Sequence, residues 1–195
     1  MTRFILASSS PRRRELLASV GAEFDVLPSH VPEEHRPGEA PEDYVARLSR
    51  EKANAIAMQH PSRWVIAADT TVLLGDQLLE KPLNKADAAR MLSLIAGKTH
   101  IVYTGVTLQN AGLEIRDTRV AESEVRMLPL SQSDVEWYVA TGEPLDKAGA
   151  YAVQGVGAMF IDSIHGSYTN VVGLPLALLF QMMRKVGIDP LISNG

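Results

Sequence analysis

Residues 4–17 read FILASSSPRRRELL. The first four residues form an apolar run of strand length, which breaks at three serines. Pro11 follows, and its fixed φ angle and missing N–H suit the first position of a helix. Ser10 stands directly before it, where a serine oxygen can cap a free backbone N–H group. This stretch therefore predicts a strand, a tight turn and a helix that begins at Pro11.

The predicted helix begins with three consecutive arginines, Arg12, Arg13 and Arg14. The N-terminal end of a helix already carries about half a positive charge, so a basic first turn favours a bound anion. Backbone N–H groups, serine hydroxyls and guanidinium groups at a strand-to-helix turn are suited to a phosphate chain. The alternative is that these arginines are solvated or paired with nearby acids.

The composition is that of a globular chain of 195 residues, 46% hydrophobic and 22% charged. This length allows a sizeable core, and we expect a single domain over residues 1–187 with a flexible C-terminal tail at residues 188–195. The sequence has no cysteine. Disulfides, thiolate metal sites and a cysteine nucleophile are therefore excluded.

The net charge of -4 argues against a general nucleic-acid binder. The arginine run should therefore serve a compact anion rather than a long phosphate backbone. No stretch approaches the roughly 18 uncharged apolar residues of a membrane span, and no signal peptide is recognisable. We expect a cytoplasmic protein that acts on neither nucleic acid nor a membrane.

Residues 31–40 read VPEEHRPGEA, with two prolines and a glycine. This composition predicts a loop. Glu33 or Glu34 could hold a cation beside a phosphate chain. The alternative is an acidic surface loop with no such role.

Pro41 opens a predicted helix that runs to about Gln59. On a helical wheel Lys52 falls in the middle of the apolar stripe, whereas Arg47 and Arg50 lie well away from it and are expected in solvent. An ammonium group that faces a core is costly unless it is paired. Lys52 therefore either extends along its stem to solvent or meets an anion in a cleft.

An apolar run at residues 64–68 predicts a buried strand that delivers Asp69 at its end, with Thr70 directly after it. A carboxylate at a strand end is a common position for a catalytic group. The alternative is that Asp69 caps a turn. A Gly-Asp pair at residues 75–76 predicts a hairpin, which returns Lys81 toward Asp69.

Residues 143–155 read EPLDKAGAYAVQG, where small residues surround charged and amide side chains. Small residues let a ligand approach the backbone closely. Gln154 could read the edge of a base, or it could satisfy backbone groups at a glycine-relieved β corner. A further strand is expected at residues 158–164.

Five motifs, in order, resemble those of the Maf family of nucleoside triphosphate pyrophosphatases. They are LASSSPRRRELL at residues 6–17, ADT at 68–70, EKP at 80–82, DKAGAY at 146–151 and QG at 154–155. The resemblance implies an elongated α/β fold with a mixed, curved β-sheet, flanking helices and two lobes around a central cleft, similar to the inosine triphosphate pyrophosphatases. It also implies hydrolysis of a nucleoside triphosphate to the monophosphate and diphosphate, with Mg²⁺ or Mn²⁺ as the cofactor.

The resemblance also implies roles for individual residues. The proton acceptor of the family falls on Asp69, which would activate water as a general base or by holding the metal ion together with Glu33. The positions linked to base choice are Arg12, Thr70 and Gln154. The positions expected to bind phosphate are Ser8, Arg13, Lys52 and Lys81.

Two branches of the family differ at these motifs. The branch that acts on dTTP and UTP has Ala-Asp-Thr, Glu-Lys-Pro and Asp-Lys-Ala-Gly-Ala-Tyr, as this sequence does. The branch that acts on 7-methyl-GTP tends to have Ser-Asp-Gln, Gly-Lys-Pro and a glutamate in the place of Gln154. The resemblance therefore implies hydrolysis of dTTP and UTP in nucleotide-pool house-cleaning, with modified pyrimidine nucleotides as further candidates and 7-methyl-GTP as the alternative within the family.

A function of another class also fits the resemblance. The family is associated with septum formation, which suggests a non-enzymatic, nucleotide-binding regulator of cell division. Nucleotide binding without turnover would distinguish this alternative. The resemblance is also compatible with a homodimer.

Overall fold

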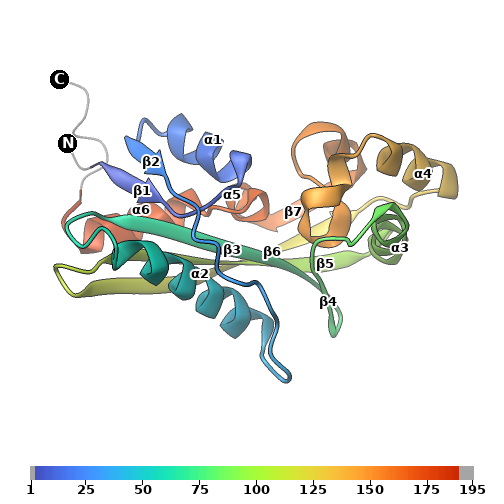
Figure 1. Ribbon diagram of the computed structural model, residues 1–195. Coiled ribbons are helices and arrows are strands. Elements are labelled where there is room, and N and C mark those ends of the chain that lie inside the picture. The colour runs from blue at the N-terminus through green and yellow to red at the C-terminus, as the bar shows by residue number, and fades with distance from the viewer. Residues whose placement is uncertain (1–2, 189–195) are drawn as a thin grey trace. The chain divides into compact units, whose positions relative to one another are not determined.

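The computed structural model describes residues 3–188 of the chain (Figure 1). Within this range, seven strands form one sheet in the order β2-β1-β3-β5-β6-β7, and β4 pairs with β3 outside this path. The strands are β1 (Phe4–Leu6), β2 (Phe24–Val26), β3 (Val65–Leu74), β4 (Gln77–Leu79), β5 (Thr99–Asn110), β6 (Ile115–Met127) and β7 (Ile161–Gly166). The sheet is mixed, because β1 pairs in parallel with β2 and β3 whereas β3–β4 and β6–β7 are antiparallel.

Helices flank this sheet, which confirms the predicted α/β class. They are α1 (Pro11–Ser19), α2 (Pro41–Ala57), α3 (Lys85–Ile95), α4 (Gln132–Ala140), α5 (Tyr168–Val172) and α6 (Leu176–Lys185). Three 3₁₀ turns complete the regular structure of residues 3–188: η1 (Glu143–Asp146), η2 (Ala148–Ala150) and η3 (Gly155–Phe160). Within residues 3–188, no helix has the length and apolar character that a membrane crossing requires.

The chain divides into two compact units. The first contains the residues up to Asp69, Thr104–Ala121 and the residues from Gly173 onward. The second contains Thr70–Tyr103 and Glu122–Val172. The single domain predicted over residues 1–187 stays a prediction, and the predicted tail lies, from residue 189 on, outside the described residues.

The start of the chain forms the strand, turn and helix that its sequence predicts. The three residues of β1 are fully buried, and α1 begins at Pro11 with Ser10 in the N-cap position. The Ser10 side chain makes no capping bond. Instead, the hydroxyl of Ser8 accepts the backbone N–H of Ser10 at 3.2 Å. A serine therefore does stabilise this turn, but from two residues earlier.

Helix α2 packs closely on the sheet within the first unit (Figure 1). A Cβ built on Gly105 of β5 would overlap the backbone of Val45 and Ala46 in α2. The glycine thus permits a helix-to-strand approach that a larger residue would prevent. An apolar cluster consolidates this packing and contains Ile5, Ala7, Ala53, Ile56, Ala57, Val65 and Ala67. The approach brings the buried face of α2 against β3.

Strand β3 is longer than its sequence predicts. The strand was expected to end at Asp69, but it continues through Asp69 and Thr70 to Leu74, over ten residues in all. Threonine at positions 70 and 71 is β-branched and favours the extended backbone, which explains the continuation. Asp69 is therefore held within a regular strand. The predicted hairpin follows, with Leu74 opposite Gln77.

The second unit has its own apolar core, which contains the buried faces of α3 and α4. Asn84 caps α3 by accepting the N–H of Asp87, and Ser131 caps α4 in a capping box with Asp134. The expected strand at residues 158–164 is wrong at its start, because η3 occupies Gly155–Phe160 and β7 begins at Ile161. Gly155 has a φ of 74°, which ends extended structure at that point.

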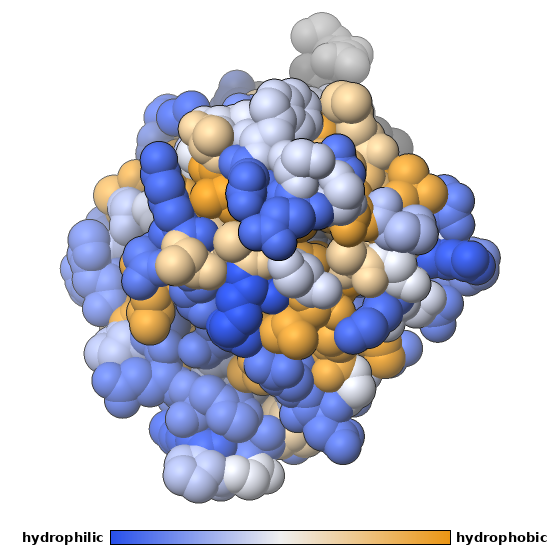
Figure 2. All heavy atoms as spheres, turned by 90° about the vertical axis from the view of Figure 1, so that its right-hand side faces the viewer, coloured by the Kyte–Doolittle hydropathy of each residue, from blue (hydrophilic) through white to orange (hydrophobic). Residues whose placement is uncertain are grey.

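The surface of the second unit includes exposed apolar side chains. Trp137 is 52% exposed and Met159 is 66% exposed. Figure 2 shows the face at the right-hand side of Figure 1, where apolar side chains lie between hydrophilic ones. This face therefore presents a mixed surface.

Candidate active site

Two carboxylates converge on the ammonium group of Lys52. Lys52 Nζ donates to Glu33 Oε1 at 2.5 Å and to Asp69 Oδ1 at 2.6 Å. The side chains of Lys52 and Asp69 are 7% and 9% exposed, whereas that of Glu33 is 40% exposed. Lys52 therefore meets anions rather than extending to solvent. Residues from the loop, α2 and β3, far apart in sequence, form one charged cluster.

Arg13 and Ser8 form the second part of this site. Arg13 Nε donates to the backbone carbonyl of Gly173 at 2.8 Å, and Arg13 Nη1 donates to Ser8 Oγ at 3.3 Å. Of the three arginines, Arg14 is exposed, whereas Arg12 and Arg13 are half-buried. The first turn of α1 thus faces partly inward. Arg13 is not a solvated surface residue, because its guanidinium group binds Gly173 and Ser8.

The charges in this cluster act on one another. Burial raises the pKa of the Asp69 carboxyl, and the positive charges of Lys52 and Arg13 oppose that rise. Burial also lowers the pKa of the Arg13 guanidinium, which Asp69 and Glu33 oppose. A carboxylate whose pKa is raised binds a proton more readily than an exposed aspartate. Asp69 is therefore suited to accept a proton, and it lies near Lys52 and Arg13, whose positive charges can bind phosphate.

The second unit carries the other predicted site residues. Thr70 directly follows Asp69 in β3 and is half-buried. Lys81 is exposed two residues after β4. Gln154 is half-buried in the N-cap position of η3, so its segment forms 3₁₀ turns rather than a β corner.

The carboxylates fit a divalent cation of the kind that accompanies nucleotides. Within residues 3–188, no group of three or more histidine, aspartate and glutamate side chains forms a complete metal site. Mg²⁺, however, is commonly held by one or two carboxylates together with phosphate oxygens of the substrate. Glu33 and Asp69 provide two carboxylates that already converge on one cationic group, Lys52 Nζ. These residues therefore fit Mg²⁺ or Mn²⁺.

A bidentate ion pair anchors the loop that carries Glu33. Arg47 of α2 donates to Glu39 through Nε at 2.6 Å and Nη2 at 2.7 Å, and to the backbone carbonyl of Glu34 at 3.0 Å. The side chains of Arg47 and Glu39 are each 11% exposed. The expectation that Arg47 is solvated was therefore wrong. A helical wheel shows only the helix itself, and here a loop covers the polar side.

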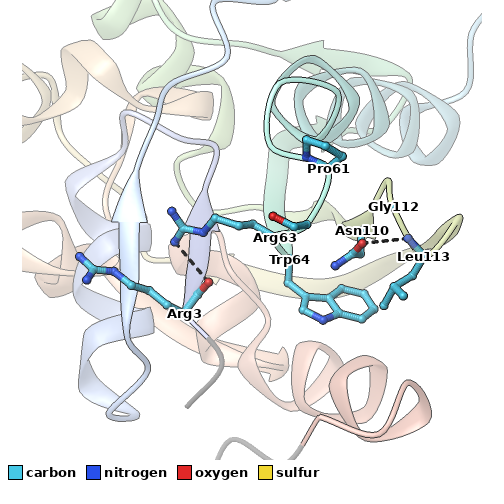
Figure 3. Close-up of a pocket in the computed structure, with 8 residues that line it drawn as sticks. Arg3, Pro61, Arg63, Trp64, Asn110, Gly112 and Leu113 are labelled. Carbon is cyan, nitrogen blue, oxygen red and sulfur yellow. Dashed lines mark hydrogen bonds between the residues drawn. The ribbon is translucent and has the colours of Figure 1, made fainter.

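A pocket elsewhere in the first unit does not include the predicted site. It has a volume of about 610 Å³ and is lined by Arg3, Pro61, Ser62, Arg63, Trp64, Asn110, Gly112 and Leu113. Figure 3 shows Arg63 extending toward the backbone of Arg3. Both arginines also pair with Asp25, at 2.6 and 2.7 Å. These contacts connect β2, which contains Asp25, to the residues that precede β1 and β3.

Proteins similar to this chain are nucleotide pyrophosphatases by name. The dTTP/UTP pyrophosphatase of Koribacter versatilis is 47% identical over 94% of this chain and 94% of its own length. Those of Myxococcus xanthus and Geobacter sulfurreducens are 48% and 47% identical, over 96% and 95% of this chain and 94% and 97% of their own.

A solved structure is similar in fold. The Staphylococcus aureus Ham1 protein superposes with a TM-score of 0.51 and 12% identity, over 95% of this chain and all of that one. At this identity the likeness concerns the fold alone. The model of the Maf-like protein family matches residues 3–186. The chain therefore belongs to the Maf-like protein family.

Proposed function

We propose that this protein hydrolyses dTTP and UTP to the nucleoside monophosphate and pyrophosphate. Relatives that share 46% to 48% of its residues over nearly the whole chain carry the name of this activity. The observation that carries the proposal is the cluster in which Asp69, Lys52 and Glu33 are in contact, with Arg13 acting on Asp69 electrostatically. A proton acceptor beside buried cations is what the hydrolysis of a phosphoanhydride requires.

The triphosphate carries close to four negative charges, which the protein must neutralise. We assign phosphate binding to Ser8, Arg13, Lys52 and Lys81. The hydroxyl and the guanidinium donate hydrogen bonds to phosphate oxygens, and the two ammonium groups supply positive charge. Because phosphoryl chemistry depends mainly on position and charge, these contacts supply much of the catalysis.

Asp69 is the proposed proton acceptor. It removes a proton from water as the water oxygen bonds to the α-phosphorus. The bond from that phosphorus to the bridging oxygen breaks, and pyrophosphate leaves with the electron pair. Glu33 and Asp69 would hold the divalent cation, which neutralises phosphate charge and lowers the pKa of bound water.

Base choice is assigned to Arg12, Thr70 and Gln154. The amide of Gln154 has one donor group and one acceptor group, which match the acceptor and donor on the edge of uracil or thymine. This contact does not distinguish the two rings. Both UTP and dTTP are therefore expected substrates, and modified pyrimidine nucleotides that keep the same edge are further candidates.

The test is pyrophosphate release from dTTP, UTP, CTP, GTP and 7-methyl-GTP in the presence of Mg²⁺ or Mn²⁺. Asp69→Asn is the inactive variant, and Asp76→Asn, at the exposed tip of the β3–β4 hairpin, is the matched control. We expect release from dTTP and UTP by the wild type and the control but not by Asp69→Asn. Release chiefly from 7-methyl-GTP would retain the reaction and overturn the substrate assignment.

Nucleotide binding without any pyrophosphate release would contradict the enzymatic proposal. The homodimer with which the family resemblance is compatible and the cytoplasmic location expected from the sequence both stay predictions. Size-exclusion chromatography with light scattering tests the first, and fractionation of the source cells tests the second.

A further inference from the structure

A hydrogen-bonded polar pair, the buried Tyr138 and the half-buried Glu143, lies in the second unit. Tyr138 belongs to α4 and its side chain is fully buried. Glu143 is the first residue of η1. Tyr138 Oη donates to Glu143 Oε1 at 2.7 Å. The two residues thus connect the end of α4 to the turn that follows it.

The pair also binds the backbone on both sides of Gln154. Tyr138 Oη accepts the N–H of Ala152 at 3.1 Å. Glu143 accepts the N–H of Val156 at 3.0 Å and that of Gly157 at 2.9 Å. The segment that carries Gln154 is therefore held two residues before and two and three residues after the glutamine.

The neighbouring glycines show how closely the pair approaches this segment. A Cβ built on Gly155 would lie 2.5 Å from Glu143 Oε2, and one built on Gly157 would overlap Tyr138 Oη. Gly155 also has a φ of 74°, a backbone conformation that residues other than glycine rarely adopt. The turn after Gln154 is therefore shaped around these two polar side chains.

The charge of Glu143 suits this role. Burial raises the pKa of the Glu143 carboxyl, but hydrogen bonds from Gly157, Tyr138 and Val156, together with the positive charge of Lys147, outweigh burial and hold that pKa below its ordinary value. The carboxylate is thus ionised and accepts all three hydrogen bonds. A neutral amide at the same position would have one acceptor oxygen in place of two.

We propose that Tyr138 and Glu143 are positioning residues for Gln154 and thereby set the selectivity of the protein for the pyrimidine base. This inference rests on the proposed function, in which Gln154 reads the base. The pair acts through the backbone of residues 152–157 and touches no substrate. Loss of the pair should therefore alter discrimination between bases more than it alters hydrolysis itself.

The test compares UTP with CTP, because uracil and cytosine differ at the edge that Gln154 is proposed to read. Tyr138→Phe removes a single oxygen and keeps the ring that packs edge-to-face on Phe160. We expect the ratio of kcat/KM for UTP to that for CTP to fall roughly 5- to 50-fold, the effect of misplacing one hydrogen bond. Glu143→Gln should lower the ratio in the same direction.

Two further variants separate positioning from a general structural effect. Gln154→Ala gives the UTP-to-CTP ratio in the absence of base reading. Adding Tyr138→Phe to this variant should not lower the ratio further, because the effects of residues that act as a unit are not additive. Tyr103→Phe removes a hydroxyl from another buried tyrosine of the same unit. It should leave the UTP-to-CTP ratio unchanged.

A second measurement does not depend on activity. Amide hydrogen exchange in the ligand-free protein should be faster at Ala152, Val156 and Gly157 in both Tyr138→Phe and Glu143→Gln, with α3 unchanged. This inference alone would be overturned if the wild type prefers UTP and neither variant changes the UTP-to-CTP ratio. Equal losses of kcat/KM for UTP and CTP in the variants would overturn it as well. Absence of any release from UTP by the wild type would overturn the proposed function and this inference with it.

Discussion

At the scale of single residues, Asp69 illustrates how burial and charge act in opposite directions on one group. Burial raises its pKa, and Lys52 and Arg13 oppose that rise. Lys52 also contacts Glu33, so it keeps one carboxylate partner when Asp69 loses its charge. Substitution at Asp69 should therefore affect the reaction more than the fold.

For Asp69→Asn we expect a loss of kcat of roughly 10²-fold or more, the usual contribution of a general base. The amide keeps the size of the side chain but cannot take the proton. Turnover of dTTP at saturation gives the effect, and a melting temperature within a few degrees of the wild type shows that the fold is intact. Near-normal turnover would remove Asp69 from the mechanism.

Gln154→Glu should lower turnover of dTTP and UTP. A carboxylate accepts hydrogen bonds but cannot donate one to a carbonyl oxygen of the base, and an unpaired contact of this kind costs about 1–3 kcal/mol, or roughly 5- to 150-fold. Values of kcat/KM for both nucleotides measure the effect. Unchanged selectivity would exclude Gln154 as the residue that reads the base.

His100 makes the stability of the protein dependent on pH. It is buried, its Nε2 lies 2.8 Å from Tyr151 Oη, and burial lowers its pKa from 6.5 to about 4. The unfolded chain therefore binds a proton between pH 6.5 and pH 4 that the folded chain does not. The stability that depends on a neutral His100 is therefore fully present above pH 6.5 and is lost as the pH falls toward 4.

Between pH 7 and pH 4.5, the His100 contribution to the free energy of unfolding should fall by about 2 kcal/mol. His100→Gln removes the titration while it keeps a hydrogen-bonding group near Tyr151. Urea unfolding of both proteins at the two pH values measures the difference. The free energy of the variant should depend less steeply on pH, and equal slopes would contradict the prediction.

At the scale of elements, helix α2 organises the loop beside it as well as the sheet beneath it. Lys52, on its buried face, contacts β3 through Asp69, and Arg47, a little more than one turn earlier, binds Glu39 and the backbone of Glu34. The Arg47 interaction holds the pKa of Glu39 at about 2, below its ordinary value. The loop thus reaches the charged cluster from a fixed anchor on the helix.

Arg47→Met should destabilise the fold by about 2–3 kcal/mol, because it leaves the largely buried Glu39 carboxylate without its bidentate partner. Arg14→Met, at an exposed position of helix α1, should cost less than about 0.5 kcal/mol, as is usual for surface positions. Urea unfolding measures both. Equal losses in the free energy of unfolding at the two positions would show that the ion pair of Arg47 with Glu39 does not stabilise the fold.

At the scale of the whole molecule, a cluster of buried apolar side chains helps to stabilise each of the two units. One contains residues of β1, α2 and β3, and the other contains the buried faces of α3 and α4. The carboxylates proposed to hold a cation, Glu33 and Asp69, belong to neither apolar cluster. Folding and metal binding should therefore be separable.

Removal of divalent cations with a chelator should abolish pyrophosphate release and leave the melting temperature of the nucleotide-free protein within a few degrees of its original value. Activity should return on addition of Mg²⁺ or Mn²⁺. Thermal unfolding followed by circular dichroism and a pyrophosphate assay check the two parts. Cooperative unfolding on chelation would show instead that a cation supports the fold.

Local sequence was sufficient to predict much of the architecture. The strand, turn and helix over residues 4–19 and the hairpin after β3 both depend on residues close together in the chain. The motifs were sufficient to identify the family. These features follow from backbone preferences and hydrogen bonds that act within a few residues, so they can be recognised in a single sequence.

Contacts between distant segments were needed for the rest. The pairing of Lys52 with Glu33 and Asp69, the burial of Arg47 under a loop and the binding of the Gln154 segment by Tyr138 and Glu143 join residues that local patterns do not relate. A charged side chain can be solvated, paired or buried at the same position of a helix. Which of these occurs depends on what the folded chain places opposite it, because the cost of burying a charge is set by its partners.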